Sequence, residues 1–192
     1  MAGTNKVEQG GTLKSENDKD TVITNQKTDK ASSNTVTIEA NGKNDKVEVT
    51  LKDVNIDTSS RNNAAVSVTG SCNTTIKLDG DNALKSDTYR SGIASTGSLT
   101  ISGGENDSLT AQGGSGANGI SSSGSLTISG GTVTATGGNS TGIVGYGGSG
   151  IYSSSGVAIS GGAVTANGGD SKDGYGGNGI YSSRGAISGG TV

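Results

Sequence analysis

Four residue types with distinctive chemistry are missing from this sequence, and a fifth is nearly absent. It contains no histidine, proline, phenylalanine or tryptophan, and its single cysteine is Cys72. Without histidine, no Ser–His or Cys–His pair can activate a nucleophile. One cysteine supports neither a disulfide framework within the chain nor a cysteine-based metal site. Cys72 lies in an alternating apolar segment, where we interpret it as a small buried residue.

Hydrophobic and basic residues are also limited. Only 28% of the 192 residues are hydrophobic, which suits a core one or two side chains across better than a wide globular core. No apolar run is long enough to cross a bilayer, and residues 1–20 contain no secretory signal. The net charge is −3 and there is no basic patch, so we expect neither membrane insertion nor nucleic-acid binding.

Glycine, by contrast, is abundant and unevenly distributed. Residues 1–90 contain 6 glycines and residues 91–192 contain the other 30, whereas 25 of the 31 charged residues lie in the first part. A half that is rich in glycine and serine is also typical of a disordered linker. These glycines, however, keep fixed offsets from Ile, Leu and Val, which favours a folded repeat.

Two short phrases recur in the second half. Gly-Ile dipeptides follow one another at steps of 27, 31 and 29 residues, at positions 92–93, 119–120, 150–151 and 179–180. Each is followed by an apolar segment that ends in Gly-Gly, such as 99–104 and 126–131. A period of this length is typical of a stacked array, in which one unit cannot bury its apolar face without its neighbours.

Each repeat contains three short alternating segments. In the second repeat they span 119–122, 125–129 and 132–136, and Gly-Gly pairs mark the corners. Three parallel strands per repeat predict an all-β, right-handed parallel β-helix (a solenoid) of about 27–31 residues per coil over 35–192. Residues 1–34 are predicted to be a polar N-terminal leader or cap. The last coil stops inside a strand, so we expect it to be truncated.

Alternation within the strands also predicts the core. Aliphatic side chains should point inward and stack from coil to coil in three columns, namely Ile93, Ile120, Ile151 and Ile180; Ile101, Ile128, Ile159 and Ile187; and Leu109, Val133, Val164 and Val192.

The repeated phrases resemble a known group. The segment Ser-Leu-Thr-Ile-Ser-Gly-Gly-Thr-Val-Thr-Ala-Thr-Gly-Gly at 125–138 resembles repeats of bacterial, mostly Gram-positive, cell-surface proteins described as carbohydrate-binding domain-containing. Segments 47–56 and 75–84 are similar to opening coils of that group. The resemblance covers about residues 35–192 and implies a pectin-lyase-like β-helix. It also implies non-enzymatic binding of plant polysaccharides, with calcium in some relatives.

Tyrosines provide the sharpest local signal. The motif around Tyr146 and Tyr152 returns 29 residues later around Tyr175 and Tyr181. Tyr152 and Tyr181 follow inward isoleucines, so they should face outward. Ranks of tyrosine on adjacent coils could stack against sugar rings and donate phenol hydrogen bonds. Alternatively, the rings stack on each other and cover the glycine-rich loop.

Two further patterns suggest ligands. Asp170 and Asp173 lie beside the tyrosine motif and could supply carboxylates to a weak calcium site, although aspartates in turns commonly bond their own backbone. Asp79 and Asp81 occupy a similar turn. Threonines are expected to align on outer faces, as in ice-binding solenoids, although β-propensity explains threonine in strands equally well; they are Thr110, Thr134 and Thr165, and Thr100 and Thr127.

These observations favour a protein without catalytic activity. Past residue 108 the only acids are Asp170 and Asp173, so a lyase or hydrolase of the β-helix type lacks its clustered carboxylates there. We predict a secreted or cell-surface module that binds polysaccharide and mediates adhesion through a rigid flank. The alternatives are a structural stalk or spacer and a scaffold that self-associates end to end; ice binding and polysaccharide cleavage are the remaining possibilities.

Overall fold

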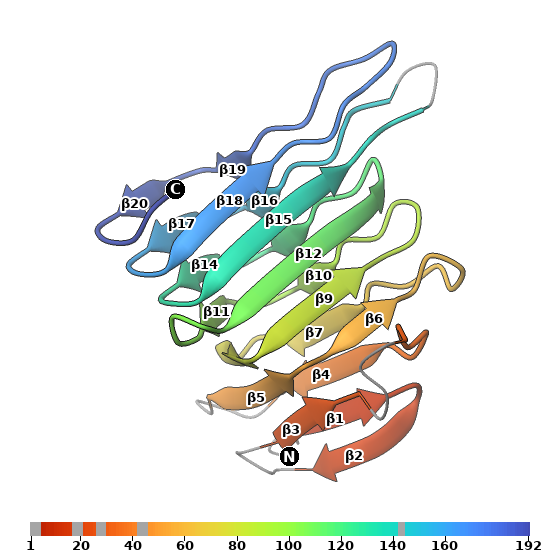
Figure 1. Ribbon diagram of the computed structural model, residues 1–192, viewed down its shortest axis with the longest axis vertical. Helices are drawn as coiled ribbons and strands as arrows, with labels where there is room; N and C mark the ends of the chain where they lie inside the picture. The colour runs from red at the N-terminus through yellow and green to blue at the C-terminus, as the bar shows by residue number, and fades with distance from the viewer. Residues whose placement is uncertain (1–4, 17–20, 26–29, 42–45, 142–144) are drawn as a thin grey trace.

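The computed structural model describes residues 5–16, 21–25, 30–41, 46–141 and 145–192, which form an all-β solenoid. Three sheets run along it, and successive coils add one short strand to each sheet, in about six turns (Figure 1). The chain climbs from the N-terminus to the C-terminus while the front strands run to the right and the rear strands return to the left, so the solenoid is right-handed (Figure 1). The predicted fold class is confirmed.

The three sheets are termed A, B and C in the order in which each coil visits them. Sheet A contains β2 (Thr12–Glu16), β1 (Asn5–Gln9), β4 (Val36–Ala40), β7 (Val66–Gly70), β10 (Ile93–Ser95), β13 (Ile120–Ser122), β16 (Ile151–Ser153) and β19 (Ile180–Ser182). Sheet B contains β3 (Thr21–Thr24), β5 (Val47–Lys52), β8 (Thr74–Asp79), β11 (Leu99–Ser102), β14 (Ser125–Ile128), β17 (Gly156–Ile159) and β20 (Gly185–Ile187). Sheet C contains β6 (Asn55–Asp57), β9 (Asp81–Lys85), β12 (Ser108–Ser115), β15 (Thr132–Gly138) and β18 (Ala163–Asn167).

The core is a narrow column of aliphatic side chains, as the alternation predicted. Ile93, Ile120 and Ile151 pair in register on sheet A, and each is 0% exposed. The predicted columns on sheets B and C are likewise in register between β11, β14, β17 and β20 and between β12, β15 and β18. Identical phrases stack because this register buries the inward aliphatic side chains of one coil against those of the next.

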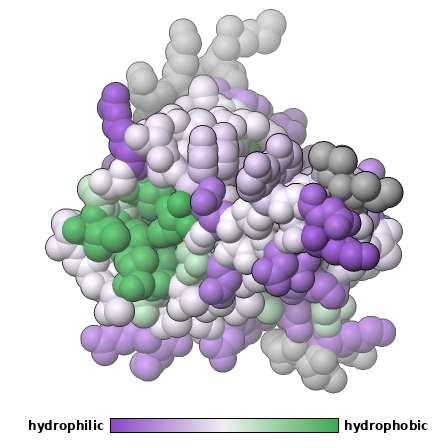
Figure 2. Space-filling model, turned by 90° about the horizontal axis from the view of Figure 1, so that it is seen from above, coloured by the Kyte–Doolittle hydropathy of each residue, from purple (hydrophilic) through white to green (hydrophobic). Residues whose placement is uncertain are grey.

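The last coil departs from this prediction. Ile187 is in register with Ile159, yet it is 63% exposed, and Val192 is 56% exposed. Both side chains were predicted to point inward in their columns, and they are exposed because no further coil covers them in the structure. Figure 2 shows the resulting apolar patch at the end of the solenoid that carries β19 and β20.

The N-terminal strands close the other end. β3 contains Val22 and Ile23, pairs in parallel with β5 and begins sheet B. β1 and β2 form an antiparallel hairpin, and β1 also pairs antiparallel with β4. This hairpin covers the hydrogen-bonding edge of β4, which would otherwise be available for pairing with another chain.

Glycine sets the shape of the loops that lead from sheet C to sheet A in the last coils. The segments 137–141, 145–150 and 168–179, termed the glycine wing, project beyond the sheets at the upper right of Figure 1. Their backbones touch directly: Gly148 N donates to Gly138 O (2.9 Å), and Gly169 N donates to Gly148 O (2.8 Å). A Cβ on Gly138 would lie 1.7 Å from Gly114 O, so no other residue fits there.

Candidate functional site

The four predicted tyrosines form two stacked pairs. Tyr152 and Tyr181 are register partners on the outer face of sheet A, with ring centroids 5.3 Å apart and planes 4° apart. Tyr146 and Tyr175 stack on the glycine wing at 5.8 Å and 10°. The prediction that Tyr152 and Tyr181 face outward is confirmed, and so is the alternative that tyrosines of adjacent coils stack on each other.

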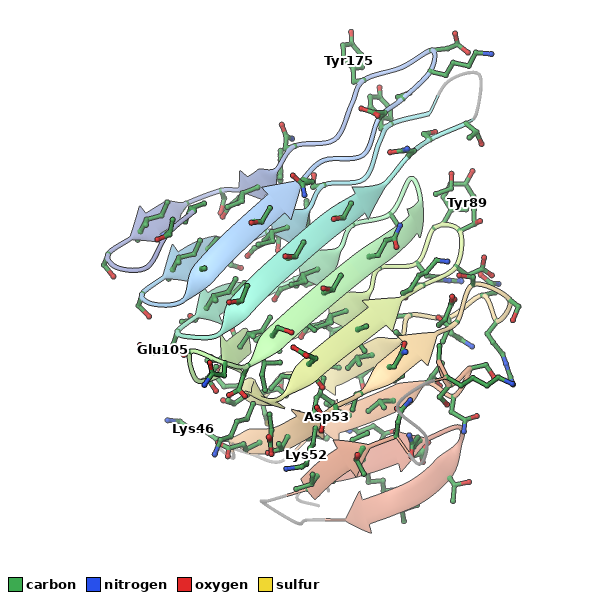
Figure 3. All side chains as sticks on the ribbon, in the orientation of Figure 1. Lys46, Lys52, Asp53, Tyr89, Glu105 and Tyr175 are labelled. Atoms are coloured by element: carbon green, nitrogen blue, oxygen red, sulfur yellow. The ribbon has the colours of Figure 1, made fainter. Side chains whose placement is uncertain are left out.

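The two pairs differ in exposure. Tyr152 is half-buried and Tyr181 is 52% exposed, whereas Tyr146 and Tyr175 are 66% and 75% exposed. The backbone holds Tyr146 and Tyr175 in place, because Gly147 N donates to Tyr175 O (2.9 Å). Both tyrosines have a glycine on each side in the sequence. Figure 3 shows the labelled Tyr175 projecting upward from the top of the wing.

This geometry limits what the tyrosines can do chemically. Within each pair, one ring face is covered by the partner, so the surfaces left for a ligand are the outer faces, the ring edges and the phenol hydroxyls. Such surfaces suit a partner that is apolar on one side and rich in hydroxyls on the other. No side chain near these rings needs to titrate for that kind of contact.

A fifth tyrosine lies on the same flank and was missed at the level of the sequence. Tyr89 is 77% exposed in the loop between β9 and β10, and Figure 3 shows it on the side of the solenoid from which Tyr175 also projects. The signal that could have found it is its distance of 27 residues from both Asn62 and Gly116. The residues around Tyr89 do not repeat elsewhere in the sequence, unlike those around the other four tyrosines.

The proposed calcium ligands lie on the glycine wing but do not form a metal centre. Asp170 and Asp173 are exposed, and the Asp170 amide donates to Asn139 Oδ1 (2.8 Å). Among the residues that the structure describes, no three acidic, histidine or cysteine side chains are grouped closely enough to hold a metal ion. Calcium at Asp170 and Asp173 therefore remains a prediction.

The fold gathers a different set of acids at the corner between sheets B and C. Asp53 Oδ1 accepts from Asp81 N (3.2 Å), and Asp79 pairs with Lys52 (2.8 Å) and raises its pKa, chiefly through this hydrogen bond. Asp107 accepts from Gly104 N (2.7 Å) and Gly80 N (2.9 Å), and these amides hold its pKa below the ordinary value. Carboxylates occupied in this way stabilise turns rather than transfer protons.

The threonine ranks are in register as predicted. Thr110, Thr134 and Thr165 are consecutive partners on sheet C, and Thr100 pairs with Thr127 on sheet B. The sheet B rank ends at Ala158.

Comparisons with known proteins return no relative. No family of known proteins matches the chain, and neither a curated protein nor a solved structure is significantly similar to it. In the part of the chain that the structure describes, there is no helix of the length and hydrophobicity that a bilayer crossing requires. The site must therefore be interpreted from its own geometry.

Proposed function

We propose that this protein is a non-catalytic module that binds polysaccharide through a rigid flank, at the cell surface or in the extracellular medium, and so mediates adhesion. The observation that carries the proposal is the row of tyrosines on the side of the solenoid that bears the glycine wing. Three of them are more than 60% exposed, although the apolar body of a tyrosine gains free energy when it is removed from water. The bacterial carbohydrate-binding type indicated by the repeated phrases belongs to the same proposal.

Rigidity supports this function. The wing backbones pack without intervening side chains, and each coil is hydrogen-bonded to the next, so the exposed rings are held before any ligand arrives. A preordered aromatic surface loses little conformational entropy on binding. A flank of this kind would hold a long polymer by many weak contacts instead of enclosing one small molecule.

The test is affinity electrophoresis of the chain in native gels that contain xylan, hydroxyethyl cellulose, mixed-linkage β-glucan or polygalacturonate. We expect retardation by at least one of these polymers and its loss in the double variants Tyr146→Ala/Tyr175→Ala and Tyr152→Ala/Tyr181→Ala. The double variant Thr134→Ala/Thr165→Ala, on the outer face of sheet C, is the matched control and should migrate like the wild type. A wild-type chain that none of the polymers retards would refute the proposal.

Repeating the gels with a chelator tests the calcium prediction. We expect retardation to persist, because no third carboxylate of the described residues joins Asp170 and Asp173. Retardation that disappears with EDTA and returns with calcium would assign a metal site to these two residues.

Two alternative functions have observations of their own. Mutual stacking of the tyrosines within each pair also fits a stalk that only needs a stable surface. The apolar patch with Ile187 and Val192 fits end-to-end self-association. Sedimentation velocity separates these alternatives: a stalk sediments as a monomer at all concentrations, whereas a self-associating chain gives larger species that an Ile187→Lys variant abolishes.

A further inference from the structure

Tyr89 occupies a backbone conformation that does not suit its side chain. Its φ is +60°, in the left-handed region, which bulky residues rarely adopt. The ring contributes little to the core because the residue is 77% exposed. The fold therefore holds this ring in solvent at a conformational cost that core packing does not offset.

The same turn in neighbouring coils shows which residues suit it. Asn62, Tyr89 and Gly116 each lie four residues before the first residue of a sheet A strand, and these strands, β7, β10 and β13, are in register. All three have positive φ, at +53°, +60° and +70°. Asparagine and glycine are the residues that tolerate this conformation best, so Tyr89 is the exception in its column.

Gly116 connects Tyr89 to the tyrosines of the glycine wing. A Cβ placed on Gly116 would lie 3.5 Å from Cε1 of Tyr89 and 3.4 Å from the carbonyl oxygen of Tyr146. Gly116 therefore lies between the ring of Tyr89 and the backbone of Tyr146, and it places no side chain there. Tyr175 then stacks on Tyr146 in the next coil.

From these contacts we infer that Tyr89 is a carbohydrate-stacking residue, which extends the Tyr146–Tyr175 pair into a track of three rings along the solenoid axis. This inference rests on the proposed polysaccharide-binding function. Tyr146 and Tyr175 each have one face covered by the other, whereas no ring among the described residues stacks on Tyr89. Tyr89 thus offers an open ring face to a pyranose ring, while the other two contribute edges and hydroxyls.

The spacing of the rings indicates a polymer rather than a single sugar. Tyr89 and Tyr175 lie three coils apart, which corresponds to roughly 14 Å at about 4.8 Å per coil. That distance exceeds one sugar ring, so a chain that lies parallel to the axis would contact all three tyrosines. Simultaneous contacts of this kind raise the overall affinity above that of each contact alone.

The experiment uses the same four polymers and the variants Tyr89→Asn, Tyr89→Phe and Asn62→Gly. Tyr89→Asn removes the ring and suits the left-handed turn, so we expect unfolding at the same or higher urea concentration together with about two- to tenfold weaker retardation. Tyr89→Phe retains the ring and should keep most of the retardation. Asn62→Gly changes the equivalent turn without touching a ring, and it should bind like the wild type.

The outcomes separate this inference from the proposed function. If the wild type is retarded and Tyr89→Asn is retarded equally, the inference is overturned while the proposed function stands. If Tyr89→Phe loses as much retardation as Tyr89→Asn, stacking on the ring is excluded. If no polymer retards the wild type, both fail together. The chain has no tryptophan, so tyrosine emission gives a second measurement, in which the polymer-induced change should be smaller in Tyr89→Asn.

Discussion

The stacked column of isoleucines on sheet B allows a direct test of what stabilises the solenoid. Ile128 and Ile187 occupy the same column and differ in cover: Ile128 is 0% exposed between two coils, and Ile187 is 63% exposed on the last coil. Replacing each with alanine removes the same atoms from the same position of the repeat. Any difference in the loss of stability therefore reports the contribution of the covering coil.

The two variants should differ several-fold in the unfolding free energy that they lose. Ile128→Ala removes buried atoms and leaves a cavity, which costs about 2–5 kcal/mol of unfolding free energy. Full burial of an isoleucine contributes about 1.5–3 kcal/mol, and Ile187 is only about 37% buried, so Ile187→Ala should cost no more than about 1 kcal/mol. No closed cavity forms at Ile187, because the site is open to water.

Urea unfolding followed by far-UV circular dichroism measures both values, and the m-values show whether the two variants unfold over the same surface. Ile159→Ala, at 1% exposed, serves as a second buried variant and should behave like Ile128→Ala. Equal losses for Ile128→Ala and Ile187→Ala would refute the reasoning, since they would mean that stacking of coils does not provide the burial.

Two more outcomes follow from the loops and corners. Gly138→Ala should unfold the glycine wing or strongly lower the urea midpoint, because its Cβ would lie 1.7 Å from Gly114 O. Gly185→Ala is the control and should leave the midpoint unchanged, because nothing lies within 4 Å of its Cβ position. Equal midpoints for the two variants would contradict the packing of the wing. The pKa of Asp107 is lowered in the folded state by amides of Gly104 and Gly80, so its contribution is present above the unfolded pKa and is lost as the pH falls below about 4. Between pH 7 and pH 3 the wild type should therefore lose more of its urea midpoint than Asp107→Asn, and identical losses would exclude this carboxylate as a source of the pH dependence.

Only part of the tyrosine site could be predicted from the sequence. Tyr146, Tyr152, Tyr175 and Tyr181 belong to a phrase that repeats, and repetition places them on adjacent coils whatever the details of the loops. Tyr89 belongs to no such phrase. Tyr89 projects from this side of the solenoid because of a turn geometry that it shares with Asn62 and Gly116. A pattern of residue types does not reveal that these three residues have positive φ.

The corner acids show the same limit. Asp53, Asp79, Asp81 and Asp107 are dispersed over more than fifty positions of the sequence, and only their separations of 26 and 28 residues, close to one coil, connect them. They meet because the parallel register places Lys52 beside Asp79 and brings Asp53 next to Asp81. Their carboxylates then bind backbone amides, a hydroxyl and a lysine, so the structure gives them a role in turns.

The sequence by itself determined the path of the chain, because a repeated apolar phrase can bury its inward face only by lying on its copy, and that requirement sets the register, the core columns and the parallel sheets. The tertiary structure alone decided which side chains are exposed on the flank and at the ends. Loops of unequal length, backbone turns with positive φ and the presence or absence of a covering coil control exposure, and each depends on contacts between residues that are distant in the chain.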